Sequence, residues 1–254
     1  MTSGPTLHDE LRLRISRYEW AELAASLGER GYARLPGLLG ADECCELMRL
    51  YDQPDRFRSS VEMGAHAFGE GSYRYFAYPL PALVAALREL LYPPLRAIAN
   101  RWHELLGVTA RYPASLSGFL EGCHAAGQTR PTPLLLHYGV DGYNRMHQDI
   151  YGEIAFPLQM ACLLSTPRER AAAAGAPRPA GFAGGEFLIS EHRPRMQVRI
   201  EAIRLEAGEA ILFANATRPV RSARGYARAQ MRHGLNRIGA GERVALGIIF
   251  HDAT

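Results

Sequence analysis

Two side chains with metal-binding chemistry lie two positions apart, in the segment Met146-His147-Gln148-Asp149. In an extended segment, side chains at positions i and i+2 project from the same face, so the His147 imidazole and the Asp149 carboxylate can converge on one point. Together with one distant histidine they would make a two-histidine, one-carboxylate site, which binds Fe(II) on one face and leaves other positions open. The pair therefore needs a third ligand from elsewhere in the chain.

A segment near the C-terminus supplies candidates for that ligand and for an anion-binding residue. His233 lies in one apolar run and Arg243 begins the next, with Gly239 and Gly241 between them. This pattern predicts a β-hairpin that carries His233 on one arm and Arg243 at the start of the other. A guanidinium there could bind a carboxylate through two parallel hydrogen bonds close to the metal, and the distal carboxylate of 2-oxoglutarate is the obvious candidate.

Each of these residues also has a simpler interpretation. His147 and Asp149 could make only a local hydrogen bond in a loop, His233 could be a satisfied core histidine, and Arg243 could be a solvated residue at a strand start. Among the other histidines, His137 and His251 are interpreted as structural, and His124 and His192 as surface residues. The adjacent pair His251–Asp252 is not expected to form a second metal site.

The elements that must position these residues change in character near residue 131. Helical spacing of apolar residues predicts helices at 17–30, 41–51, 81–91 and 94–106, the last two separated by Pro93–Pro94. A short strand or loop is predicted at 32–39. After residue 131, short apolar runs alternate with turn residues, which is typical of a β-sandwich or barrel: 133–139, 156–165, 185–190, 210–215, 232–238 and 243–250.

We therefore predict a mainly β fold with an α flank, in which N-terminal helices pack against a jelly roll. The whole chain, 1–254, is predicted to form one domain, with a mostly helical flank at 1–130 and the jelly-roll core at 131–254. The segment 167–183 is expected to be a surface loop.

Composition excludes several classes of protein. The chain has 254 residues, 47% of them hydrophobic, and a net charge of +3, so it is neither disordered nor strongly charged. No apolar run approaches the roughly 20 residues that span a bilayer. The first residues lack the apolar stretch of a signal peptide, and the four cysteines form no C-x-x-C pair, so a cytoplasmic protein is expected. All 29 basic residues are arginine, which excludes lysine-based mechanisms.

Taken together, the motifs resemble those of the Fe(II)/2-oxoglutarate-dependent oxygenases, especially the prolyl-hydroxylase-like branch. The resemblance covers roughly 32–50 and 133–251, and within the branch the chain most resembles a bacterial group linked to oxidative repair of damaged nucleic acid. The matching segments are YARLPGLLGADECCEL (32–47), Tyr138-Gly139-Val140-Asp141-Gly142 before His147, Gly184-Gly185-Glu186-Phe187, GEAILF (208–213), and the pair His233 and Arg243.

This resemblance implies a double-stranded β-helix and a set of site residues. It makes His147, Asp149 and His233 the iron ligands, and Arg243 the residue that binds the C5 carboxylate of 2-oxoglutarate. Tyr138 would be a hydrogen-bond partner of the cosubstrate, although a core tyrosine is nearly as good an interpretation. The implied reaction consumes O2, converts 2-oxoglutarate to succinate and CO2, and hydroxylates a substrate C–H bond.

The substrate is left open by the sequence. A small molecule or an amino-acid-like compound is the leading hypothesis, alkylated nucleic acid that loses its alkyl group by oxidation is the alternative, and a non-catalytic ligand-binding jelly roll is the third. Between residues 218 and 243, seven arginines face one acidic residue, Glu242, which could serve phosphates or be an ordinary solvated surface. Tyr73, Tyr75, Phe76 and Tyr78 could stack on a base, line a pocket or pack a strand. No membrane partner is expected, and the oligomeric state is left open.

Overall fold

Two antiparallel sheets face each other in the computed structural model of the chain, which describes residues 5–168 and 181–254. Most of the predicted surface loop at 167–183 lies outside the described residues. The larger sheet has seven strands in the order β1 (Tyr32–Leu35), β11 (Ala210–Ala214), β7 (Leu158–Leu163), β15 (Arg243–Ile249), β5 (Leu134–Tyr138), β4 (Ser72–Phe76) and β2 (Phe57–Glu62).

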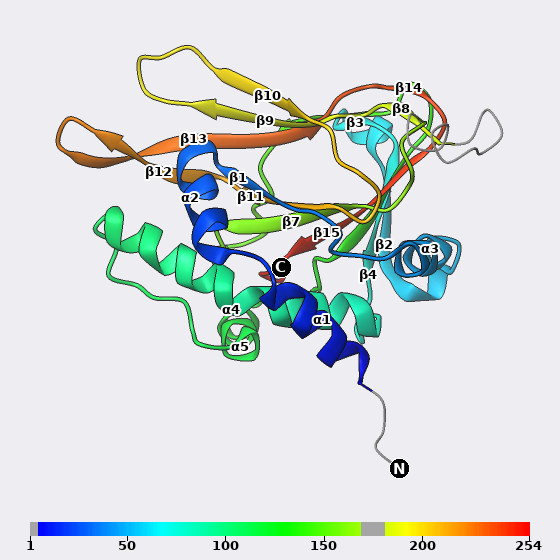
Figure 1. Cartoon of the computed structure of the whole chain (residues 1–254), viewed down its shortest axis with the longest axis horizontal. Helices are drawn as coiled ribbons and strands as arrows, with labels where there is room; N and C mark the ends of the chain where they lie inside the picture. The colour runs from blue at the N-terminus through cyan, green and yellow to red at the C-terminus, as the bar shows by residue number, and fades with distance from the viewer. Residues whose placement is uncertain (1–4, 169–180) are drawn as a thin grey trace.

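The smaller sheet contains the strand that carries His233. Its order is β10 (Arg199–Ile203), β9 (Phe187–His192), β13 (Gly225–Leu235), β6 (Tyr143–His147) and β3 (Gly69–Glu70), and β12 (Thr217–Ser222) pairs with the first half of β13. The β9–β10 and β12–β13 hairpins extend from the same end of the molecule (Figure 1). A separate two-stranded sheet is formed by β14 (Ile238–Ala240) and β8 (Ala183–Gly184).

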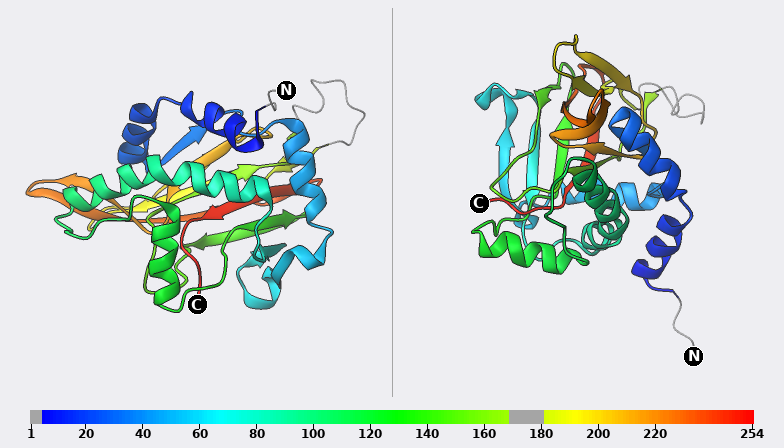
Figure 2. Two further views of the ribbon diagram at one scale, coloured as in Figure 1. Left: turned by 90° about the horizontal axis from the view of Figure 1, so that it is seen from below. Right: turned by 90° about the vertical axis from the view of Figure 1, so that its left-hand side faces the viewer.

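Helices cover the face of the seven-stranded sheet that is turned away from the smaller sheet (Figures 1 and 2). They are α1 (Leu7–Ser16), α2 (Trp20–Arg30), α3 (Ala41–Leu50), α4 (Ala82–Leu105) and α5 (Leu116–Ala125). α1 was not predicted from the sequence, although Thr6 and Asp9 form a capping box at its start, with Asp9 N donating to Thr6 Oγ1 at 3.2 Å. Within the described residues, no helix has the length and apolar content required to cross a membrane.

The first 130 residues contribute to both sheets, so the prediction of a helical flank is only partly correct. β1, β2 and β4 belong to the seven-stranded sheet, and β3 pairs with β6 in the smaller one. β4 pairs with β5, which places Tyr75 opposite Leu134. Strand β2 was not predicted because Phe57–Glu62 contains many polar residues, whereas a strand was one of the interpretations of the tyrosines in β4.

The predicted break at Pro93–Pro94 is wrong, because α4 runs without interruption from Ala82 to Leu105. Proline lacks the backbone N–H that continues a helix, and its ring disfavours the preceding turn. Here packing outweighs that cost, since the helix buries Leu91, Tyr92 and Leu95 around the prolines.

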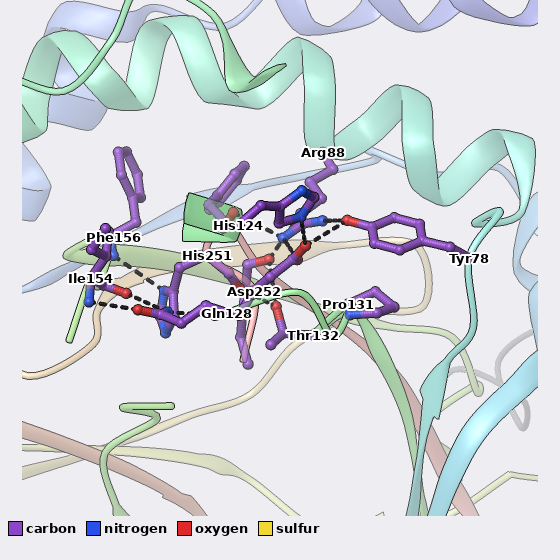
Figure 3. Close-up of polar contacts among 12 residues, drawn as sticks. Tyr78, Arg88, His124, Gln128, Pro131, Thr132, Ile154, Phe156, His251 and Asp252 are labelled. Carbon is purple, nitrogen blue, oxygen red and sulfur yellow. Dashed lines mark hydrogen bonds and ion pairs between the residues drawn. The ribbon is translucent and has the colours of Figure 1, made fainter. Parts of the chain in front are cut away.

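α4 is also joined to the segment that follows the last strand, through a buried ion pair (Figure 3). Arg88 Nη2 donates to Asp252 Oδ1 at 2.8 Å, and the two side chains are 1% and 0% exposed. The Arg88 guanidinium also donates to the backbone carbonyls of Ile249 and Phe250. Asp252 Oδ2 accepts from Tyr78 and lies 2.9 Å from Nε2 of the half-exposed His124. This network fixes the C-terminal segment against α4, which gives Asp252 the structural role expected from the sequence.

We expect Arg88→Met to lower the free energy of unfolding by about 3–5 kcal/mol, because it leaves a buried carboxylate without its cation. Denaturant titration followed by circular dichroism measures the change. Arg101→Met is the matched control, because Arg101 pairs with Glu104 on the exposed surface of the same helix, and such a pair contributes roughly 0–1 kcal/mol. Equal effects of the two substitutions would contradict the structural role of the buried pair.

Candidate active site

All five site residues predicted from the sequence line one cavity of about 380 Å³ between the two sheets. His147 and His233 come from the smaller sheet, Tyr138 and Arg243 come from the larger sheet, and Asp149 follows the end of β6. The remaining walls are mainly apolar and aromatic, including Tyr73, Tyr75, Tyr151, Leu134, Leu136, Met160, Phe187, Phe213 and Ile249. The same cavity is thus lined by three potential metal ligands, His147, Asp149 and His233, and by the guanidinium of Arg243.

The H-x-D pair lies at the point where β6 ends. His147 Nε2 is 3.5 Å from Asp149 Oδ1, so the two side chains converge as their spacing predicts. His147 Nδ1 lies 2.7 Å from the carbonyl oxygen of Arg145. A carbonyl oxygen only accepts hydrogen bonds, so Nδ1 carries the proton and Nε2 offers its lone pair to the cavity.

His233 is brought beside this pair by the pairing of β13 with β6. His233 and His147 are register partners, and their ring centroids lie 4.2 Å apart. His233 Nε2 is 3.2 Å from Asp149 Oδ2, and the rings of Phe187 and Phe213 pack against the imidazole. The ligand atoms of His147, Asp149 and His233 all lie within 4.8 Å of one another. Two imidazole nitrogens and one carboxylate at this spacing fit a divalent iron ion.

Burial and mutual charge shift the pKa values of the three groups. Burial alone would raise the pKa of Asp149, but the positive charge of His233 and the hydrogen bonds of both histidines hold it well below its usual range. Burial lowers the pKa of His233, and the nearby His147 adds to that effect. Burial by itself would lower the pKa of His147, but the hydrogen bond to Asp149 outweighs burial and raises that pKa. An ionised carboxylate beside two imidazoles is a suitable donor set for a cation.

Asp149 is held by residues that the sequence analysis missed. Its backbone N–H donates to Asn215 Oδ1 at 2.8 Å, and Asn215 Nδ2 donates to its backbone carbonyl. Tyr151 donates its hydroxyl hydrogen to Asp149 Oδ1 at 2.7 Å. Burial and the negative charge of Asp149 raise the pKa of Tyr151, so this hydroxyl keeps its proton. Tyr151 follows Asp149 by two positions, as Asp149 follows His147, so this spacing could have identified Tyr151 from the sequence. No comparable local pattern identifies Asn215.

Arg243 reaches the cavity by a route that differs from the predicted hairpin. β13 and β15 belong to different sheets and do not pair, and the chain between them forms β14. Arg243 instead pairs with Tyr138 across β15 and β5. Gly185 (φ +66°) makes room for the arginine, because a Cβ there would lie 2.9 Å from Arg243 Cδ.

The guanidinium of Arg243 is buried without a carboxylate partner among the described residues. The residue is 4% exposed, and its Nε atom has no hydrogen-bond acceptor in the described part of the chain. Burial lowers its pKa to about 10, so it still carries its charge at neutral pH. Tyr138 is buried beside it, and its hydroxyl accepts a long hydrogen bond, 3.5 Å, from Asn144 Nδ2. An unpaired cation facing a cavity is a fitting partner for an anionic ligand.

A family model described as "Oxygenase, catalysing oxidative methylation of damaged DNA" matches residues 71–253, which is well over half of the chain. The chain belongs to this Oxygenase-NA family. A relative, the uncharacterized protein MT2286 of Mycobacterium tuberculosis, is 44% identical over 190 residues, which cover 75% of this chain and 77% of the relative.

Solved structures of 2-oxoglutarate/Fe(II) oxygenases have a similar fold. A prolyl-4-hydroxylase of Pseudomonas putida has a TM-score of 0.50 at 14% identity and covers 93% of this chain and 100% of its own. The α-ketoglutarate-dependent epimerase SnoN of nogalamycin biosynthesis has a TM-score of 0.51 at 17% identity, and the shares are 90% and 80%. This Oxygenase-NA protein therefore shares the fold of these enzymes, and its His147, Asp149 and His233 are spaced as the ligands of one metal ion would be.

The clustering of His147, Asp149 and His233 predicts the effect of removing one of them. We expect His233→Ala to weaken the binding of Co(II), which serves as a probe for Fe(II). The loss should exceed the roughly 10–100-fold that is typical when a residue hydrogen-bonded to a metal ligand is removed. His251→Ala is the control, because His251 is also fully buried but is not among the residues that line the cavity. Calorimetric titration of each folded variant measures the affinity. Retention of wild-type affinity by His233→Ala would exclude this histidine as a ligand.

Proposed function

We propose that this oxygenase hydroxylates a C–H bond of a substrate that enters the cavity between the sheets. The observation that carries the proposal is the buried Arg243, which has no carboxylate partner among the described residues and lies in the same cavity as His147, Asp149 and His233. In this proposal the last three residues bind iron, and Arg243 binds the distal carboxylate of 2-oxoglutarate with Tyr138 beside it. The two facing sheets correspond to a double-stranded β-helix, and residues 1–254 make one oxygenase domain.

Each part of the cavity has its own task in this reaction. Bound iron supplies the activation of O2, coupled to the decarboxylation of 2-oxoglutarate to succinate. Arg243 neutralises and orients the cosubstrate, and the Tyr138 hydroxyl lies where it can add a hydrogen bond. The apolar walls, with Leu134, Leu136 and Ile249 among them, exclude water from the reacting atoms. A cavity of about 380 Å³ suits a small molecule or an amino-acid-like group in addition to the cosubstrate.

Arg243→Leu separates the binding of the cosubstrate from the binding of metal. Removal of a charge-assisted hydrogen bond in a buried site costs on the order of 2–5 kcal/mol, so the affinity for 2-oxoglutarate should fall roughly 30-fold to several-thousand-fold. Iron content should stay near the wild-type value, because Arg243 is not one of the three clustered ligands. Arg243→Lys should be milder, since an ammonium group keeps the charge but lacks the forked geometry.

The measurement is a titration of 2-oxoglutarate against anaerobic Fe(II)-loaded protein, followed by the visible charge-transfer band of the chelated 2-oxo acid. Succinate formation in air then tests for turnover. Wild-type affinity in Arg243→Leu would assign the cosubstrate site to another residue. An iron-loaded wild-type protein that gives neither band nor succinate would favour the non-catalytic jelly roll.

Alkylated nucleic acid is the second candidate substrate, and a surface feature favours it besides the family's description. The seven arginines between 218 and 243 do not form one surface. Arg218 is buried and pairs with Glu191, Arg237 pairs with Asp141, and Arg243 lies in the cavity. The other four are exposed on β12–β13 and, with exposed Arg195 on the adjacent β9–β10 connection, are called here the hairpin arginines: Arg195, Arg221, Arg224, Arg228 and Arg232.

The hairpin arginines are suited to a polyanion. No described carboxylate pairs with any of them, and the segments 192–200 and 217–241 contain no acidic residue. The base of the β12–β13 hairpin lies beside the cavity, because Gln148, which lines it, donates to the carbonyls of Ala216 and Met231 at 2.9 and 2.7 Å. A nucleic acid whose phosphates contact the hairpin arginines would therefore lie close to the cavity.

Reversal of two hairpin charges tests this second candidate. Arg224→Glu/Arg228→Glu should weaken the binding of an oligonucleotide and reduce the slope of log affinity against log salt by about 2, close to 1 for each phosphate that is no longer bound. Arg49→Glu/Arg101→Glu changes the net charge equally at exposed positions on α3 and α4 and serves as the control. Fluorescence anisotropy at several salt concentrations measures both. If the wild type binds no oligonucleotide at low salt, the candidate is excluded.

A further inference from the structure

The two oxygens of the Asp149 carboxylate have different surroundings. Oδ2 lies 3.2 Å from His233 Nε2, whereas Oδ1 accepts a hydrogen bond of 2.7 Å from the Tyr151 hydroxyl and lies farther from a histidine, 3.5 Å from His147 Nε2. We propose that Tyr151 is a positioning residue that reserves Oδ1 by this hydrogen bond, so that Asp149 binds the metal through one oxygen. This inference rests on the proposed role of Asp149 as an iron ligand.

The hydroxyl of Tyr151 is itself held in place for this task. Tyr75 donates its hydroxyl hydrogen to the Tyr151 oxygen at 2.9 Å, so the Tyr151 hydrogen is directed to Asp149. Consecutive hydrogen bonds of this kind polarise and strengthen one another. The backbone carbonyl of Tyr151 accepts a hydrogen bond from Thr254 N at 3.1 Å, and the centroid of the Tyr151 ring lies 6.1 Å from that of the His251 ring. Thr254 and His251 belong to the C-terminal segment that Arg88 holds against α4.

The hydrogen bond has a direct consequence for the cosubstrate. Three ligand atoms from the protein leave three positions on a six-coordinate iron, and 2-oxoglutarate and O2 need all of them. A carboxylate whose second oxygen is free can take one of these positions by binding through both oxygens. Tyr151 therefore protects the open face of the metal, and its loss should weaken the binding of 2-oxoglutarate more than it weakens the binding of the metal.

Tyr73 provides the matched control on the same wall of the cavity. It lies on β4 two positions before Tyr75, lines the cavity, and makes an edge-to-face contact with Tyr75 at 5.4 Å between ring centroids. Its hydroxyl makes no hydrogen bond to another described residue. Tyr73→Phe thus removes a phenolic hydroxyl from the cavity without touching the Tyr75–Tyr151–Asp149 chain.

The test uses the whole protein loaded with Co(II), whose visible spectrum reports coordination number, and titrates it with 2-oxoglutarate. In Tyr151→Phe we expect an altered Co(II) spectrum before the cosubstrate is added, and an affinity for 2-oxoglutarate about 10–100-fold below that of the wild type. Tyr75→Phe should produce a smaller shift in the same direction, because it weakens the donor and leaves the ring of Tyr151 intact. Tyr73→Phe should stay within about twofold of the wild type.

The outcomes separate this inference from the proposed function. If wild-type protein binds 2-oxoglutarate and Tyr151→Phe matches Tyr73→Phe in both spectrum and affinity, the positioning role is wrong while the function stands. If Co(II)-loaded wild-type protein binds no 2-oxoglutarate at all, the proposed function fails. Thermal unfolding of each variant shows whether it is folded, and should Tyr151→Phe fail to fold, the spectrum and affinity of Tyr75→Phe decide alone.

Discussion

A guanidinium group that is buried without a carboxylate partner in the described part of the chain is the constraint on which this site depends. Taking an ion out of water costs several kcal/mol even after a protein relaxes around it, and a buried cation normally lies beside an anion. Arg243 shares its cavity with the Asp149 carboxylate, yet no ion pair joins them. The Asp149 carboxylate is already engaged by two histidines and a tyrosine, so it is not free to neutralise the arginine. A carboxylate group of a ligand in this cavity would supply the missing counter-ion of Arg243.

The two facing sheets keep these charges apart. Arg243 begins a strand of the larger sheet, and His233 lies near the end of a strand in the smaller one. The seven residues 236–242 connect these two strands. A hairpin would have placed both on one surface, where a flexible arginine could fold back onto the carboxylate. With one group on each sheet, the separation is set by the packing of two layers, which is far stiffer than a turn.

The site was predictable from the sequence to the extent that its geometry is local. The spacing of His147 and Asp149 on an extended segment suffices to bring their side chains together, and Tyr151 obeys the same spacing. His233 and Arg243 were identified by their order along the chain, but the path between them was not, because glycines allow a turn and a crossing equally well. Asn215 is specified only by the pairing of distant strands.

The fold was predicted less well where packing overrides local preference. Pro93 and Pro94 lie inside a helix because the apolar side chains around them are buried. The free energy of this burial depends on the tertiary structure and cannot be read from the local sequence. Strand β4 is rich in polar residues because Tyr73 and Tyr75 line the cavity from one face, while Arg74 on the other face packs over the ring of Tyr51. Alternation of apolar and polar residues marks a strand only where one face is dry and the other wet.

The long strand β13 restricts where residues can be inserted into or deleted from this protein. Its side chains alternate, so that Met231 and His233 face inward while Arg228 and Arg232 are exposed. Gln230 and His233 pair with His192 and Ile189 of β9. Adding or removing one residue between Gln230 and His233 would turn Arg232 toward the cavity and His233 toward solvent. A change at the connection of β12 to β13, around 222–225, would only lengthen or shorten an exposed hairpin. Insertions and deletions among related proteins should therefore accumulate at that tip and be absent a few residues further along the same strand.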